Sequence, residues 1–143
     1  MVSVGRDRSG LFAPAVKEYA ERVAHYTKVE LVELSAGRSK TEEARAIVGR
    51  LRPSEWLVAL DEKGEEMDSV AFSRIIERAR NESRDLCFAL GGDDGLERSV
   101  LERAWMVLSL SRMTLPHRLA RVVLMEQLYR AHTLIRGEPY HRV

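Results

Sequence analysis

Short apolar runs alternate with longer amphipathic segments along the chain. Residues 1–4, 56–60, 86–90 and 105–110 are largely apolar, and polar or glycine residues follow each of them. Residues 29–34 alternate apolar and charged positions, as a half-exposed strand does. These five segments are the predicted strands.

Apolar positions spaced three and four residues apart fill the segments between and after these strands, which predicts helices there. The predicted helices cover residues 11–26, 41–51, 70–79, 96–103 and 117–135. Thr41, with Ser39 as the alternative, is the expected N-cap of the second helix, and Ser69 is that of the third. Residues 63–66, with a glycine among charged side chains, are predicted as a turn.

Strands and helices therefore follow one another, and three of the central strands are almost wholly apolar. This order favours an α/β fold with a mainly parallel sheet flanked by helices, because such strands are buried on both faces. The 143 residues contain no internal repeat, low-complexity tract or linker. A single domain over residues 1–143 is therefore predicted.

The composition, with 45% hydrophobic and 31% charged residues, indicates a globular rather than a disordered protein. No apolar run approaches the roughly 20 residues of a membrane helix. Residues 1–6 lack the apolar stretch of a signal peptide. A cytoplasmic location without a membrane partner is therefore expected.

Cys87 is the single cysteine, so the chain can form no internal disulfide. Its apolar neighbours favour a buried packing residue over a nucleophile. The histidines and this cysteine do not have zinc-site spacing, so no metal is expected. The sequence also lacks the Gly-x-Ser-x-Gly elbow of the hydrolases.

Positive charge is concentrated at the end of the chain. Residues 111–143 contain six arginines and two glutamates, a net charge of +4, whereas residues 1–110 carry a net charge of −3. Such a basic end suggests an anionic partner, of which nucleic acid is the commonest. A solvated helix face is the alternative.

The last predicted helix is apolar around most of its circumference, so it must be buried on more than one side. One side can pack on the sheet and the other on a second copy of the chain. A two-fold homodimer is therefore predicted. In the alternative, the short helix 96–103 and the C-terminal tail cover the second side.

Three predicted strands end in segments that suit a ligand site, because ligands bind at the carboxyl ends of strands in open α/β sheets. Gly91-Gly92-Asp93-Asp94-Gly95 follows one strand, and its glycines permit positive φ and close approach of a ligand. Leu60 ends a second strand, and the polar loop 110–116 follows a third. In the tail, Tyr140 or His141 could stack on a base, and Arg142 could hold a phosphate or an anionic base.

Four strings in the last third of the chain carry a family resemblance: residues 88–96, 108–117, 121–131 and 137–142. In this order they resemble the ribosomal RNA large subunit methyltransferase H family, the pseudouridine N3-methyltransferases of the SPOUT superfamily that act on 23S ribosomal RNA. The resemblance extends more loosely to Val4-Gly5 and Leu60-Asp61.

The resemblance implies a C-terminal trefoil knot, a homodimer, S-adenosylmethionine as the cofactor and ribosomal RNA in the assembled ribosome as the substrate. By matching position, the cofactor would be bound by Leu60, Gly91, Leu110, Ser111, Arg112, Met113, Thr114 and Leu115. Tyr140, His141 and Arg142 of the partner subunit would complete the active site. There Arg142 would stabilise the anionic base, and His141 would position it or remove its proton.

The chain departs from the family pattern at two places. Asp93-Asp94 stands where the family often has Pro-Glu, which suggests a more mobile loop, and the first strand is short for the family. Two other functions remain open at this point. One is a SPOUT methyltransferase acting on transfer RNA, and the other is a catalytically silent dimeric RNA-binding module.

Overall fold

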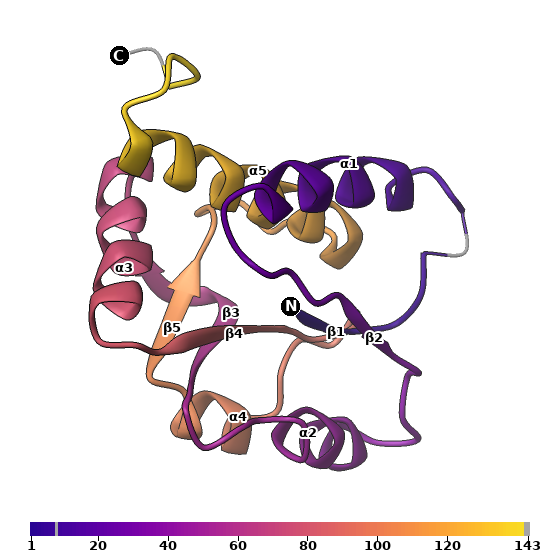
Figure 1. Ribbon diagram of the computed structural model, residues 1–143. Helices are drawn as coiled ribbons and strands as arrows, with labels where there is room; N and C mark the ends of the chain where they lie inside the picture. Colours follow the sequence, from indigo (N-terminus) through magenta and orange to yellow (C-terminus); the bar gives the residue numbers. More distant parts are fainter. Residues whose placement is uncertain (8, 142–143) are drawn as a thin grey trace.

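Five parallel strands form one sheet in the computed structural model, which describes residues 1–7 and 9–141. The strands are β1 (Val2–Val4), β2 (Val32–Leu34), β3 (Glu55–Glu66), β4 (Asp85–Leu90) and β5 (Met106–Ser109). Their order across the sheet is β2-β1-β4-β3-β5, and each neighbouring pair is parallel (Figure 1). The predicted α/β class with a parallel sheet is confirmed.

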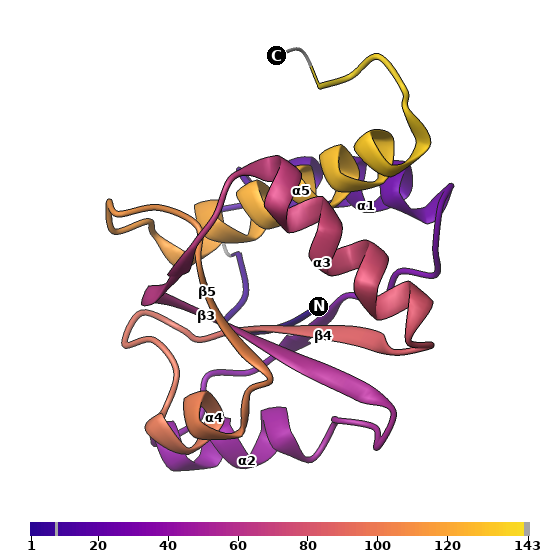
Figure 2. The ribbon, with the colours of Figure 1, turned by 90° about the vertical axis from the view of Figure 1, so that its left-hand side faces the viewer.

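Helices cover both faces of the sheet. They are α1 (Ala13–Ala24), α2 (Lys40–Val48), α3 (Ser69–Asn81), α4 (Arg98–Arg103) and α5 (His117–Arg136). Figures 1 and 2 show α1, α3 and α5 on one face and α2 and α4 on the other. The central strands are therefore buried on both sides, which explains the apolar runs at residues 56–60 and 86–90.

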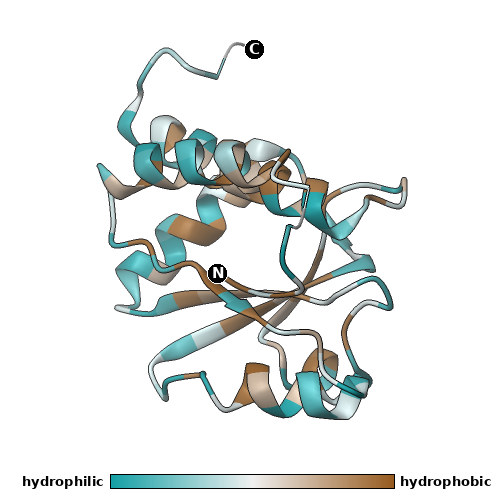
Figure 3. Ribbon diagram, turned by 90° about the vertical axis from the view of Figure 1, so that its right-hand side faces the viewer, coloured by the Kyte–Doolittle hydropathy of each residue, from teal (hydrophilic) through white to brown (hydrophobic). Residues whose placement is uncertain are grey.

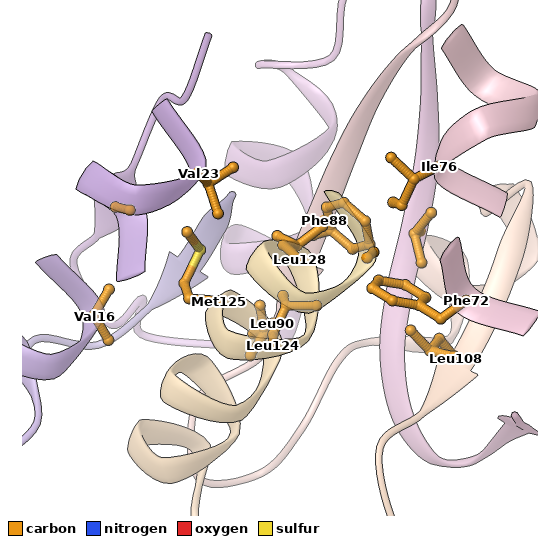
Figure 4. Close-up of a cluster of buried hydrophobic side chains, with 13 residues drawn as sticks. Val16, Val23, Phe72, Ile76, Phe88, Leu90, Leu108, Leu124, Met125 and Leu128 are labelled. Atoms are coloured by element: carbon orange, nitrogen blue, oxygen red, sulfur yellow. The ribbon is translucent and has the colours of Figure 1, made fainter. Parts of the chain in front are cut away.

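The core alternates between the two faces along each central strand. In β4, Phe88 faces the cluster under α1, α3 and α5, whereas Cys87 and Ala89 face the cluster under α2 and α4. Phe88 meets Phe72 of α3 edge to face, with ring centroids 6.1 Å apart (Figure 4). Burying a side chain of this size stabilises the fold by about 2–3 kcal/mol. Figure 3 shows the same concentration of hydrophobic residues in the central strands.

The predicted turn over residues 63–66 is wrong, because β3 continues through Glu66. Both Leu60 and Glu65 pair with Leu108 of β5, so residues 61–64 form a bulge between two stretches of pairing. Gly64 lies against the β5 backbone, where a Cβ atom would come within 2.7 Å of the Leu108 carbonyl carbon. This strand extension is charged, so no apolar pattern reveals it.

The helix caps lie earlier in the chain than expected. Ser39, the alternative to Thr41, caps α2 by accepting the backbone N–H of Glu42 at 3.2 Å. Asp68 rather than Ser69 caps α3, and its carboxylate accepts the N–H of Ala71 at 2.7 Å. Both residues that were expected to be caps, Thr41 and Ser69, lie inside their helices.

Helix α5 is enclosed by elements of its own chain. It packs against α1, α3 and the sheet, and none of residues 117–135 is exposed. The short helix α4 lies on the opposite face, so the expectation that it covers α5 is wrong (Figure 2). The homodimer stays a prediction, and so does the trefoil knot, because strand pairing alone does not trace how a chain is threaded.

Candidate functional site

A cavity of about 920 Å³ lies at the carboxyl ends of β3, β4 and β5. Seven of the eight residues that the family resemblance connects with the cofactor line it: Leu60, Gly91, Leu110, Ser111, Met113, Thr114 and Leu115. Arg112 lies outside the lining and forms an ion pair with Glu66 at 3.1 Å. The three strand ends singled out in the sequence therefore surround one cavity.

The glycine loop after β4 closes on itself. Gly95 adopts a φ of +73° and donates its backbone N–H to the Gly92 carbonyl at 3.0 Å. A Cβ atom on Gly91 would come within 2.3 Å of the Gly95 carbonyl carbon. The loop itself thus requires Gly91, whether or not a ligand approaches this backbone. Any larger residue at position 91 would displace the loop.

The loop between β5 and α5 is held against the extension of β3. Thr114 donates its hydroxyl hydrogen to Glu62 at 2.8 Å. Within the loop, the backbone N–H of Met113 donates to the Ser111 hydroxyl at 2.9 Å, and Ser109 donates to the Ser111 carbonyl at 3.0 Å. These bonds fix the backbone groups that face the cavity.

His117 is a site residue for which the sequence suggested no role. Its Nδ1 lies 2.9 Å from an Asp93 carboxylate oxygen, so the first residue of α5 contacts the glycine loop. The His117 side chain is 13% exposed, and its Nε2 has no hydrogen-bond partner among the described residues. Gly5 leaves room for the ring, since a Cβ atom there would lie 3.4 Å from Nε2. Asp93 therefore contacts α5, and the expected mobility of the loop stays a prediction.

Acidic side chains outnumber basic ones around the cavity. Its lining includes four carboxylates and two lysines: Asp61, Glu62, Asp93, Asp94, Lys40 and Lys63. A cation bound in the cavity would be stabilised by this excess of negative charge. Backbone groups of the two loops are available for hydrogen bonds to a planar polar ligand.

The tail does not reach this cavity in its own chain. Tyr140 packs edge to face on Tyr129, with ring centroids 4.6 Å apart, and donates its hydroxyl hydrogen to Glu126 at 3.1 Å. Burial, followed by hydrogen bonding to Tyr19 and Glu126, raises the pKa of Tyr140. His141 Nδ1 lies 3.3 Å from Arg130. Arg142 lies outside the described residues.

The tail follows the end of α5 that does not line the cavity. His117 at its beginning lines the cavity, whereas Arg136 ends the helix just before the tail. A helix of 20 residues spans about 30 Å. Figure 1 shows the tail leaving α5 at the helix end remote from the β5–α5 loop.

The basic end predicted from the charge distribution does not form a single patch among the described residues. Arg121 is buried and pairs with Glu33, whereas Arg130 pairs with Glu126 at 2.5 Å. Arg112 pairs with Glu66, and Arg136 lies at the opposite end of α5. Three of the six arginines in residues 111–143 are thus paired with carboxylates of the same chain.

Cys87 is buried, at 6% exposure, and burial raises the pKa of its thiol, as expected of a packing residue.

Over residues 1–7 and 9–141, no group of three or more His, Cys, Asp and Glu side chains is placed to share a metal ion. Across the same residues, no helix has both the length and the apolarity needed to cross a membrane.

Comparison with known proteins gives consistent matches over the whole chain. A family model described as "Predicted SPOUT methyltransferase" matches residues 1–141. A protein of Anaeromyxobacter sp. (strain Fw109-5) named "Ribosomal RNA large subunit methyltransferase H" is 54% identical, covering 99% of this chain and 97% of its own. A protein of Gemmatimonas aurantiaca with the same name is 42% identical over the same shares of the two chains.

A solved structure matches the fold. It is the SpoU methyltransferase AviRb from Streptomyces viridochromogenes in complex with the cofactor AdoMet, with a TM-score of 0.50 and 14% sequence identity. The match covers 92% of this chain but only 57% of the AviRb chain. At this identity the likeness shows a shared fold.

Proposed function

The chain belongs to the SPOUT methyltransferase family, and we propose that it transfers the methyl group of S-adenosylmethionine to N3 of a pseudouridine in 23S ribosomal RNA, in the assembled ribosome. One observation carries the proposal: the strand ends with the family's motifs surround a single cavity. The name of the Anaeromyxobacter relative supports ribosomal RNA as the substrate. The resemblance of residues 137–142 supports the pseudouridine.

The residues around the cavity fit S-adenosylmethionine. The carboxylates of Asp61, Glu62, Asp93 and Asp94 complement a sulfonium and an ammonium group, and the volume of about 920 Å³ lies in the range of ligand pockets. Backbone groups of residues 110–115 would hold the adenine edge, with Leu60 as an apolar wall. The cofactor supplies an electrophilic methyl group when it is bound.

The protein contributes mainly alignment and charge. The hydrogen bonds of Ser111 and Thr114 fix the loop that faces the cavity, and the His117–Asp93 contact fixes the glycine loop. Alignment of two reactants can lower a barrier by about 7–11 kcal/mol at best. The pseudouridine N3–H must lose its proton, so a nearby cation would favour the reacting anion. Arg142 is proposed for this role and His141 as the positioning group or base.

The position of the tail supports the proposal of a homodimer. Tyr140 and His141 contact Glu126 and Arg130 of α5, and neither lines the cavity at the beginning of that helix. A second copy in a two-fold arrangement can place its tail over this cavity. We therefore propose that the partner subunit's tail completes each site.

Calorimetric titration with S-adenosylmethionine and its demethylated product tests the cofactor site. Thr114→Trp places an indole at the cavity lining and is expected to abolish saturable binding. Arg112→Trp makes the same change two residues earlier, outside the lining, and is expected to retain binding within about threefold. Equal loss in both variants would contradict the proposed placement.

Methyl transfer from labelled cofactor to ribosomes, free ribosomal RNA and transfer RNA tests the substrate. We expect transfer to ribosomes that carry the pseudouridine and none to ribosomes that lack it. Transfer to transfer RNA alone would favour the alternative SPOUT function. RNA binding without cofactor binding would favour the catalytically silent RNA-binding module. The Asp93-Asp94 pair gives that module little support, because Asp93 contacts His117.

A further inference from the structure

A second cavity, of about 500 Å³, lies at the amino ends of the strands. Its floor is formed by buried apolar residues between the sheet and the helices: Val23, Ile76, Phe88, Met125 and Leu128. Several of these side chains can be seen in Figure 4. The volume is within the range of small-molecule pockets and has room for about 15–20 atoms other than hydrogen.

Exposed cations surround the apolar floor. Six line the cavity: Lys28, Arg50, Arg52, Arg80, Arg84 and Arg136. Three carboxylates also line it: Glu30, Glu55 and Asp85. Of the cations, Arg52 pairs with Glu30 at 3.1 Å and Arg80 with Glu77 at 3.6 Å. The other four have no ion-pair partner within the described part of the chain, so the rim has uncompensated positive charge.

Arg80 near the end of α3 and Arg136 at the end of α5 line the cavity together with His132, which lies one helical turn before Arg136. Burial, and then the charges of the two arginines, lower the pKa of His132. The His132 ring stacks on Tyr26 with centroids 5.3 Å apart and planes 4° from parallel. An anion bound here would be attracted by the guanidinium groups of Arg80 and Arg136.

We propose that this cavity binds a small single-chain amphipathic anion. The apolar chain would lie on the buried floor, and a carboxylate or phosphate head would lie between Arg80, Arg84 and Arg136. A wholly apolar ligand would leave the rim cations unpaired. A compact polar anion would leave the apolar floor uncovered, so the combination of the two surfaces selects a ligand with both parts.

The site is separate from the one proposed for the methyl donor. In a parallel sheet all amino ends lie at one edge and all carboxyl ends at the other, and the two cavities share no lining residue. Binding of an amphipathic anion therefore does not depend on the proposed function. The two sites can be tested one at a time in the same full-length protein.

Calorimetric titration with octyl phosphate, below its micelle-forming concentration, is the direct test. We expect saturable one-to-one binding that is at least about tenfold tighter than binding of 1-octanol or inorganic phosphate. The double variant Arg84→Ala/Arg136→Ala is expected to weaken octyl phosphate binding about tenfold. Arg98→Ala/Arg103→Ala removes the same charge from α4, on the other face of the sheet, and is expected to leave binding unchanged.

The proposal is overturned if octyl phosphate does not bind. It is also overturned if octanol binds equally well, or if both double variants weaken binding equally.

Discussion

Asp93 and His117 connect the glycine loop to the first turn of α5. Because Asp93 is 91% exposed, this contact contributes at most about 1 kcal/mol. Asp93→Ala is therefore expected to weaken S-adenosylmethionine binding by a factor of about two to five in calorimetry, with little change in stability. Asp94→Ala is the matched control, since no side-chain partner of Asp94 is found among the described residues. Equal weakening by both substitutions would show that loop charge, not the His117 contact, matters.

Asp7 organises the segment before α1. Its carboxylate accepts a hydrogen bond from the Ser9 hydroxyl at 2.5 Å and from the backbone N–H groups of Phe12 and Ala13 at 2.8 and 2.9 Å. The Ser9 bond, with the backbone bonds, lowers the pKa of Asp7 from 3.8 to about 2. A lowered folded-state pKa stabilises the fold above pH 3.8, and this stabilisation is lost as the pH falls towards 2.

Asp7→Asn is therefore expected to be less stable than the parent protein at pH 6, and about half of that difference should be gone at pH 3. Urea unfolding of both proteins at the two pH values measures the difference. Asp94→Asn serves as the control for removal of a carboxylate. A difference that stays constant between pH 6 and pH 3 would argue against the hydrogen-bonded carboxylate.

At the scale of elements, the strand extension of β3 contacts the loop between β5 and α5 through Glu62 and Glu66. Gly64 permits close packing on β5, and a Cβ atom there would lie 2.7 Å from the Leu108 carbonyl carbon and 2.8 Å from the Ser109 nitrogen. Because these are backbone atoms, the strands must separate. Gly64→Ala is expected to lower the free energy of unfolding by about 1–3 kcal/mol.

Gly92→Ala is the control for this substitution. Its Cβ atom would make ordinary contact with Val4 at 3.6 Å, so a change of less than about 1 kcal/mol is expected. Urea unfolding measures both variants. If Gly64→Ala were as stable as Gly92→Ala, β3 would not pack this closely on β5.

The sequence predicts those elements whose signal is local. Leu86 to Leu90 is a buried strand because every residue there is apolar, and α5 begins after Pro116. The β3 extension was missed because its pairing partner lies more than 40 residues away and its own residues are charged. The His117–Asp93 contact likewise depends on how the strand ends converge. Only the tertiary fold brings these groups together.

At the scale of the whole molecule, the two ends of α5 belong to different environments. Its beginning lines the proposed cofactor cavity, whereas Met125 to Arg136 border the cavity at the amino ends of the strands. Among the arginines of α5, Arg121 and Arg130 form ion pairs, and Arg136 lines that second cavity. The arginines of residues 111–141 therefore do not form one basic face on a single chain. In the proposed homodimer, the tail of each copy would lie over the cavity of its partner.

Mixing two inactive variants tests this assembly. One carries Thr114→Trp in the cavity and an intact tail, and the other carries His141→Ala and Arg142→Ala in the tail and an intact cavity. If tails act across a two-fold dimer, each mixed dimer has one complete site. Half of the dimers in an equal mixture are mixed, so methyl transfer to ribosomes is expected to recover to about a quarter of the parent rate. A mixture of Thr114→Trp with a variant bearing all three substitutions is the control and is expected to stay inactive. If the first mixture also stays inactive although mass spectrometry shows mixed dimers, the tail does not complete the partner's site.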